Sequence, residues 1–214
     1  TVYDYYVRST CINNVFGDWV GPFQLVTNPL PVPLPYSEGF EGLHGWRYSN
    51  STQVNKWFVG TATHNGGANS LYISNDDGVS NTYTLTTNST THAYRDIVIP
   101  PGTDEILFTF DFKGEGQTTL DYMRLWSVPS SFVPLAGNQL TTTNGVQVGG
   151  NMNQTPAYSN YSYVVNVTAY AGTTRRFVFE WRNNSTGGTQ PPASVDNINV
   201  TKITESYGSS KWKT

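Results

Sequence analysis

Short runs of alternating apolar and polar residues cover most of this chain. The runs are separated by clusters of Gly, Asn, Pro and Thr. A period of two is typical of strands with one buried face, and no stretch carries the 3.6-residue period of a helix. The pattern predicts strands over residues 38–41, 56–60, 70–74, 81–86, 93–98, 105–112, 119–127, 161–169, 175–182 and 194–203.

So many short strands without a helix indicate an all-β fold, and we predict a jelly-roll β-sandwich over residues 37–204. The stretch 130–160 is the least regular and is rich in Asn, Gly, Thr and Gln. We expect it to form a long surface loop with one further short strand. Residues 205–214 are polar and lack a period, which predicts a tail or linker.

The first 29 residues follow a different pattern. Two apolar runs, 2–7 and 19–26, flank a turn region and predict a β-hairpin. A hairpin of this size cannot form a core of its own, so a neighbouring part of the chain must cover it. Prolines then recur at every second position from 29 to 35. Because proline fixes φ and removes a hydrogen-bond donor, residues 30–36 are predicted to be a semi-rigid linker between two domains.

Composition narrows the possible partners. Only 13% of the residues are charged, against about 25% in typical proteins, while 14% are aromatic. The net charge of −3 and pI near 5.5 provide no basic surface, which excludes nucleic acid as a partner. No apolar run is long enough for a membrane-spanning helix. The single Cys11 excludes an intrachain disulfide.

The same composition bears on location. An uncharged, polar surface rich in Tyr and Trp is common on exported β-sandwiches that contact sugars or other proteins. The chain opens directly into a strand pattern, so we expect its export signal elsewhere in a longer protein. An extracellular or cell-surface location is predicted.

Two carboxylates are candidate metal ligands. Asp196 lies inside the apolar alternation of the last predicted strand, where a charge needs a partner. A calcium ion would supply one, because Ca²⁺ prefers carboxylate and carbonyl oxygens from several segments. Glu41, near the start of the domain, together with Asp196 would then clamp the first and last strands. Alternatively each carboxylate faces water or pairs with Arg175, Arg176 or Arg182.

Catalytic chemistry has weak support. Two carboxylates can hydrolyse a glycosidic bond, and Asp111 with Glu115 or Asp121 is the only reasonable pair. However, Lys113 shares a strand face with Asp111, so an ion pair between these two is the simpler interpretation. The histidines lack metal-ligand spacing, and no Gly-x-Ser-x-Gly motif is present. We therefore predict that the chain is not an enzyme.

The tryptophans divide into two groups. Trp57 and Trp181 alternate with phenylalanines, which predicts that both lie in the sandwich interior. Trp126, near a strand end, and Trp46 are the candidates for a surface that stacks on a sugar ring, although both could equally belong to the core.

Short motifs along the chain occur in the order found in one family of surface modules. They are Phe40-Glu41, Gly45-Trp46, Lys56-Trp57, Ser70 to Asp76, Ala93 to Asp96, Phe110 to Gly114 and Val195 to Ile198. Together they resemble the choice-of-anchor J and cleaved-adhesin group of bacterial surface modules, which are MAM-like jelly rolls. The two N-terminal runs resemble the last two strands of a fibronectin type III domain.

The resemblance implies a module that is repeated with fibronectin type III domains in large exported proteins. It implies structural calcium, with Glu41 and Asp196 at the matching positions, and adhesion to host or matrix proteins or to glycans. The chain has Tyr48-Ser49-Asn50-Ser51 where many members have an acidic run, which weakens the case for a second calcium site. Two other functions stay open, namely a structural spacer and a carbohydrate-binding appendage of a secreted hydrolase.

Overall fold

The computed structural model describes residues 2–10, 12–26 and 29–203. The chain divides into two compact units between Leu30 and Pro31. Cys11 and the predicted tail at 205–214 lie outside the described residues. Within the described part, neither of the two short helices has the length or hydropathy that a membrane span requires.

The first unit is a two-stranded antiparallel hairpin, as predicted. Strands β1 (Val2–Val7) and β2 (Val20–Val26) pair in register from Val2 opposite Val26, and a 3-10 turn over Ile12–Asn14 lies between them. Tyr6 and Trp19 are 54% and 61% exposed. A two-stranded unit with its aromatic side chains this exposed has no core, and its likeness to a fibronectin type III domain stays a prediction.

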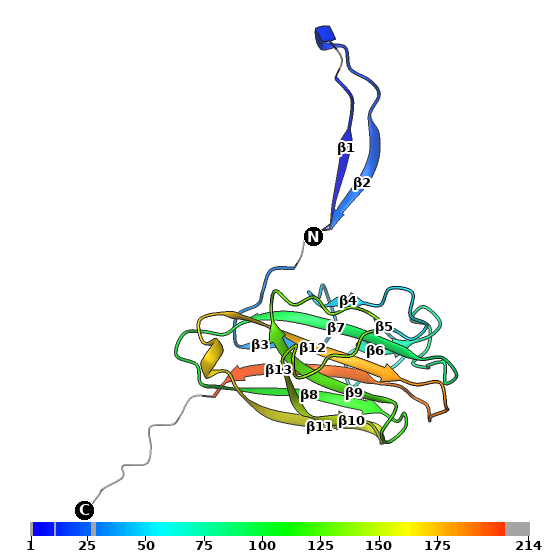
Figure 1. The fold of residues 1–214 in the computed structure, drawn as a ribbon, viewed down its shortest axis with the longest axis vertical. Coiled ribbons are helices and arrows are strands. Elements are labelled where there is room, and N and C mark those ends of the chain that lie inside the picture. The colour runs from blue at the N-terminus through cyan, green and yellow to red at the C-terminus, as the bar shows by residue number, and fades with distance from the viewer. Residues whose placement is uncertain (1, 11, 27–28, 204–214) are drawn as a thin grey trace, which may run out of the picture. The chain divides into compact units, whose positions relative to one another are not determined.

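The second unit is a β-sandwich of two antiparallel sheets (Figure 1). The first sheet has the order β10-β9-β12-β7-β4, and the second has the order β11-β8-β13-β6-β5 with β3 also paired to β13. This is the predicted all-β jelly-roll fold. The strands are β3 (Tyr36–Glu38), β4 (Arg47–Ser49), β5 (Lys56–Gly60), β6 (Ser70–Ser74), β7 (Ser89–Val98), β8 (Glu105–Gly114), β9 (Tyr122–Pro129), β10 (Val146–Met152), β11 (Thr155–Asn166), β12 (Thr174–Asn183) and β13 (Ser194–Lys202), and a 3-10 turn covers Thr168–Tyr170.

The core lies between the two sheets and is largely aromatic. On β8, every second side chain from Ile106 to Phe112 is buried, while the residues between them face outward. Phe110 of β8 meets Phe179 of β12 edge to face, with 5.1 Å between the ring centroids. Trp57 and Trp181 are completely buried, which confirms their predicted interior position.

The predicted strand pattern needs correction in several places. The strand predicted over residues 38–41 overlaps β3 only at Glu38, where β3 ends. Residues 81–86 form no strand, because Tyr83 and Thr84 hydrogen-bond to Gln190 and Asn55 side chains instead of to a neighbouring strand. The short strand β4 was not predicted. The stretch 130–160 contains β10 and the first half of β11, and the strand pattern is hidden there because the β10 register shifts between Val148 and Met152.

The proline-rich segment is not a free linker from Pro31 onward. Val32 forms a parallel bridge with Ile97, with hydrogen bonds from Val32 N to Asp96 O (3.0 Å) and from Val98 N to Val32 O (2.8 Å). The side chains of Val32 and Leu34 pack against the core. Because prolines alternate with these residues, proline can lie at the sheet edge while the apolar side chains point inward.

Candidate functional site

Strand β13 changes its partner in mid-strand, and this break builds the candidate site. Its first residues pair with β6, and its residues from Ile198 onward pair with β3. The register with β8 also shifts between Asp196 and Asn199, and Asn197 has a positive φ of 49°. Irregularities of this kind re-aim side chains and often occur next to functional sites. Asp196 and Asn197 lie at the changeover.

The loop after β5, residues 61–69, fills this break. Asn65 donates its backbone N–H to Asp196 Oδ2 (2.7 Å) and its side-chain amide to Asp111 Oδ2 (2.8 Å). Asn197 donates its backbone N–H to Asp196 Oδ1 (2.7 Å) and its amide to Asp111 Oδ2 (2.9 Å). Asn160 of β11 donates to Asp111 Oδ1 (2.9 Å). We call these five residues the carboxylate–amide cluster.

Glu41 contacts the other end of the same loop. Its carboxylate accepts hydrogen bonds from the backbone N–H groups of Ala68 and Asn69, each at 2.9 Å to Oε1. Gly67 has a φ of 60°, and a Cβ there would lie 2.2 Å from Glu41 Oε1. The positive φ favours glycine at this position, and the loop ties Glu41 to the carboxylate–amide cluster.

The three carboxylates differ in electrostatics. Burial raises the pKa of Asp196, which is 1% exposed, and the charges of Glu41 and Asp111 raise it further against the opposing backbone hydrogen bonds. Burial also acts to raise the pKa of Asp111, but the three amide hydrogen bonds outweigh it and the net pKa is lowered. Backbone hydrogen bonds from Asn69 and Ala68 lower the pKa of Glu41.

No cationic side chain of the described residues forms an ion pair with these carboxylates. Arg176 pairs with Asp96, while Arg182 donates to Tyr122 OH. The predicted ion pair between Lys113 and Asp111 is wrong, because Lys113 donates instead to Thr63 Oγ1. Lys113 and Asp111 are two residues apart on β8 and share a face of the strand. However, the side-chain amides of the cluster already donate to the Asp111 carboxylate.

The carboxylates of Glu41 and Asp196 could supply some, but not all, of the oxygen ligands of a hard cation such as calcium. Across residues 2–10, 12–26 and 29–203, no three His, Cys, Asp or Glu side chains lie close enough together to hold a metal ion jointly. Glu41 and Asp196 would therefore contribute only some of the ligands, and carbonyl or amide oxygens would have to supply the rest, which is the mixture that calcium accepts. A buried carboxylate with like charges nearby is the kind of group that a cation stabilises.

An open hollow of about 400 Å³ adjoins the cluster. Its lining includes Glu38, Glu41, Asn197 and Asn199. Carboxylate and amide groups around a solvent-accessible hollow can exchange hydrogen bonds with a polar ligand, because such groups provide both donors and acceptors.

The two tryptophans predicted to form a ligand-stacking surface are buried, so that prediction is wrong. Trp46 is 4% exposed, donates to Tyr36 OH (3.0 Å) and stacks on Phe179. Trp126 is 2% exposed beneath residues 130–145, where Phe132 and Leu140 cover it. The sequence signal for this cover is the group of apolar residues between Phe132 and Leu140.

Of the two pairs considered for glycoside hydrolysis, the pair of Asp111 with Asp121 is not accessible, whereas Glu115 of the other pair is half-buried. Asp121 is fully buried and accepts hydrogen bonds from Tyr83 OH and Asn184 N, each at 2.9 Å. Burial raises the pKa of Asp121. Asp111 faces outward from the second sheet and is occupied by amide donors. A substrate has no route to the Asp121 carboxylate.

The cluster brings together residues that sequence reasoning did not combine. Asp111 had been considered as a catalytic residue, and Asn65, Asn160 and Asn197 had no assigned role. The Asn65-Gly66-Gly67 turn was the available signal, since it marks a tight loop that can aim its amides at a neighbour.

Comparisons with known proteins found likenesses to solved structures only. No family model matches the chain, and no curated protein matches it. Similar solved structures include a carbohydrate-binding module from the β-sandwich superfamily, with 10% identity, coverage of 94% of this chain and 74% of that chain, and a TM-score of 0.49. The K1 cleaved adhesin domain of Lys-gingipain from Porphyromonas gingivalis W83 shows 13% identity, coverage of 79% and 98%, and a TM-score of 0.46.

The enzymatically active domain of bacteriophage CBA120 tailspike protein 4 is also similar, with 16% identity and a TM-score of 0.47. The match covers 77% of this chain and only 20% of the tailspike chain. Membership of the choice-of-anchor J and cleaved-adhesin group stays a prediction.

Proposed function

We propose that this chain is a non-catalytic module of a secreted or cell-surface protein that binds a glycan or a host or matrix protein. The observation that carries the proposal is the carboxylate–amide cluster beside its open hollow. Asn65, Asn160 and Asn197 present polar groups on the outside of the second sheet, where hydrogen bonds to Asp111 hold them. Pre-organised polar groups of this kind reduce the entropy lost when a ligand binds.

Two observations support the absence of catalysis. Asp121 is closed off from solvent, and the pKa of Asp111 is lowered, so Asp111 is ionised at neutral pH and cannot act as a general acid. A binding role needs neither residue to exchange a proton.

Calcium is part of the proposal. Glu41 and Asp196 would hold the ion between the start and the end of the sandwich, where it would neutralise the mutual repulsion of the carboxylates. A ligand that binds only the folded state raises the unfolding temperature by mass action.

Thermal unfolding of the purified chain in EDTA, and then with excess CaCl₂, tests the calcium. We expect a reversible rise in the midpoint that is reduced in Glu41→Gln and Asp196→Asn. Glu105→Gln, an exposed glutamate outside the cluster, is the matched control and should keep the full shift. An unchanged midpoint in the native chain would remove calcium from the proposal.

Binding itself is tested by applying the labelled chain to arrays of glycans and immobilised matrix proteins. We expect retention on a defined ligand class that Asp111→Ala and Asn197→Ala both weaken. Asp104→Ala, exposed and outside the cluster, should bind normally. A chain that binds nothing on either array would instead favour the structural spacer.

A further inference from the structure

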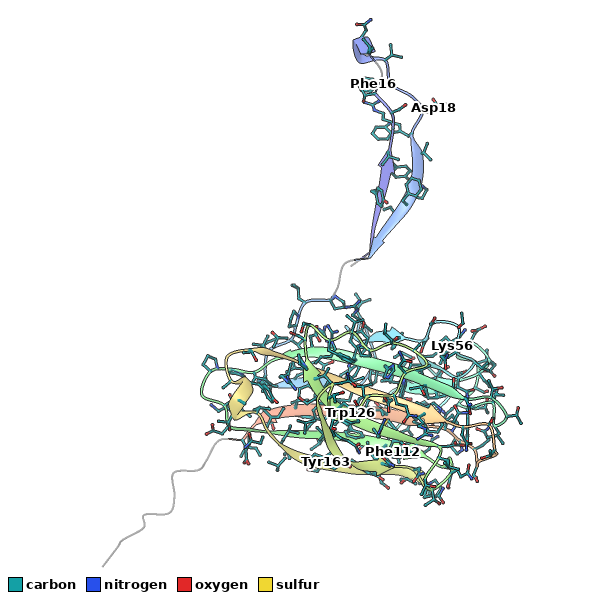
Figure 2. The ribbon with its side chains drawn as sticks, viewed as in Figure 1. Phe16, Asp18, Lys56, Phe112, Trp126 and Tyr163 are labelled. Carbon is teal, nitrogen blue, oxygen red and sulfur yellow. The ribbon has the colours of Figure 1, made fainter. Side chains whose placement is uncertain are left out.

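A second cleft opens at the edge of the sandwich where β10 and β11 lie. It has a volume of about 190 Å³. Val146 and Val148 of β10 line one side, Tyr163 of β11 lines the other, and Ser127 and Tyr170 also line it. Figure 2 labels Tyr163 on its edge strand. We call this the edge cleft.

A glycine on β10 makes room for the tyrosine ring. Gly149 has a φ of 71°, and a Cβ there would lie 2.3 Å from Tyr163 Cε1. Because no side chain stands at Gly149, the Tyr163 ring can lie along the cleft, where it forms an aromatic wall.

A buried arginine lies directly behind the edge cleft. Arg175 of β12 is 4% exposed. It donates from Nε to Ser127 Oγ (3.2 Å) and from Nη2 to Ser127 O (2.9 Å), and its guanidinium lies 3.7 Å from the centroid of the Tyr170 ring. The two residues that hold Arg175 therefore both line the cleft.

The charge of Arg175 lacks a counter-ion among the described residues. None of their ion pairs includes Arg175. Burial lowers its pKa and the nearby Tyr170 opposes this, while no carboxylate contributes. Arginine nevertheless stays charged in proteins, and a buried charge without an opposite charge is costly. An anion entering the edge cleft would provide the missing partner.

We propose that the edge cleft binds the carboxylate of an acidic sugar, such as a uronic acid residue at the end of a glycan. The planar guanidinium matches a carboxylate, and the Ser127 hydroxyl can donate to the same group while its oxygen accepts from Arg175. Tyr163 and Tyr170 offer aromatic surface to the sugar ring. This inference rests on the proposed binding function and assigns that function a ligand class.

Titration of the full chain with glucuronate, glucose and acetate, followed by calorimetry and by NMR shifts, tests the proposal. We expect glucuronate to bind at least about tenfold more tightly than glucose, as one charge-assisted hydrogen bond predicts. It should also bind more tightly than acetate, which has the carboxylate but lacks the ring that Tyr163 and Tyr170 would contact. Arg175→Met should abolish the preference for glucuronate. Val146→Trp, at a 53% exposed position of the cleft, should block binding without altering Arg175.

Val133→Trp, at a 56% exposed position that does not line the cleft, is the control and should bind as the native chain does. Unfolding temperatures show whether each variant folds. If Arg175→Met does not fold, Val146→Trp still tests the proposal. Equal affinity for glucose and glucuronate, or undiminished binding by Val146→Trp, would overturn the inference. If Asp111→Ala abolishes array binding while Val146→Trp does not, the proposed function stands and the edge cleft is not its site.

Discussion

Asp111 and Asp196 lie opposite each other in the register of β8 and β13, yet their pKa values shift in opposite directions. Three side-chain amides reach Asp111, and they stabilise its charged form. Asp196 receives two backbone N–H groups but is more deeply buried and next to like charges. The difference arises from hydrogen-bond count and burial, because the two residues are chemically identical.

The lowered pKa of Asp111 predicts a pH dependence of stability. A carboxylate whose pKa is lower in the folded state stabilises the fold above its unfolded pKa of 3.8, and this contribution disappears as the pH falls through the folded pKa. We expect Asp111→Asn to be less stable than the native chain near pH 7 and the difference to shrink toward pH 3. Urea unfolding at a series of pH values measures it.

The exposed Asp104→Asn should leave stability unchanged across the same series. A constant gap between Asp111→Asn and the native chain at every pH would contradict the prediction, since it would mean that the substitution acts through packing and not through charge.

Residues 130–145 cross the outer face of the first sheet and behave as one element. Gly137 N donates to Thr90 O (2.8 Å), Ala136 N donates to Ser49 Oγ (2.9 Å) and Arg124 Nη2 donates to Leu140 O (3.1 Å). Leu140 adds the main apolar contact over Trp126. Hydrogen bonds to the three strands β4, β7 and β9, together with the apolar contacts of Leu140 and Phe132, thus hold a segment that has no strand pairing of its own.

Because Leu140 packs over Trp126, removing the Leu140 side chain should expose Trp126 to solvent. Removing a buried leucine side chain costs about 2–5 kcal/mol, and here the loss should fall mainly on the loop. We expect Leu140→Ala to raise the acrylamide quenching of tryptophan fluorescence and the hydrogen exchange of the Gly137 amide. Leu135→Ala, at a 61% exposed position of the same loop, should change neither. Unchanged quenching in Leu140→Ala would show that the hydrogen bonds alone hold the loop.

At the scale of the whole molecule, the two units differ in their capacity to fold alone. Both core clusters of the sandwich consist of residues from the second unit. Tyr6 and Trp19 of the hairpin are exposed, and none of the hairpin side chains that the structure describes belongs to a core cluster. Independent stability of a β unit requires more than two strands with a buried face.

A fragment of residues 31–203 should therefore unfold at the same temperature as the full chain. The prediction follows because the fragment keeps every residue of both core clusters and the pairing of Val32 with Ile97. Differential scanning calorimetry of the two proteins measures it, and a second fragment starting at Tyr36, which lacks that pairing, should be less stable. A lower midpoint for 31–203 would show that the hairpin contributes to the fold of the sandwich.

The alternation of apolar and polar residues predicts the fold correctly because the apolar positions of a strand are the buried ones. The buried and outward-facing residues of β8 follow the period of two throughout, as do the inward Phe177, Phe179 and Trp181 of β12. The same pattern predicts a strand wrongly at residues 81–86, where the backbone forms hydrogen bonds to side chains and does not pair with a strand. The sequence also predicts a linker at Val32, because prolines flank it. Val32 nevertheless pairs with β7 through its own backbone N–H and C=O groups.

The sequence by itself determined the two-sheet architecture, the interior tryptophans and the candidate carboxylates, because these depend on the local pattern and on chemical type. Only the tertiary structure decided that Asp111 joins Asp196 through Asn65 and Asn197, and that Trp46 and Trp126 are covered. It alone placed Arg175, which has no ion-pair partner among the described residues, behind the edge cleft. Contacts between residues far apart in the chain depend on the strand register and on the conformation of the loops. Neither can be predicted from the pattern of neighbouring residues in the sequence.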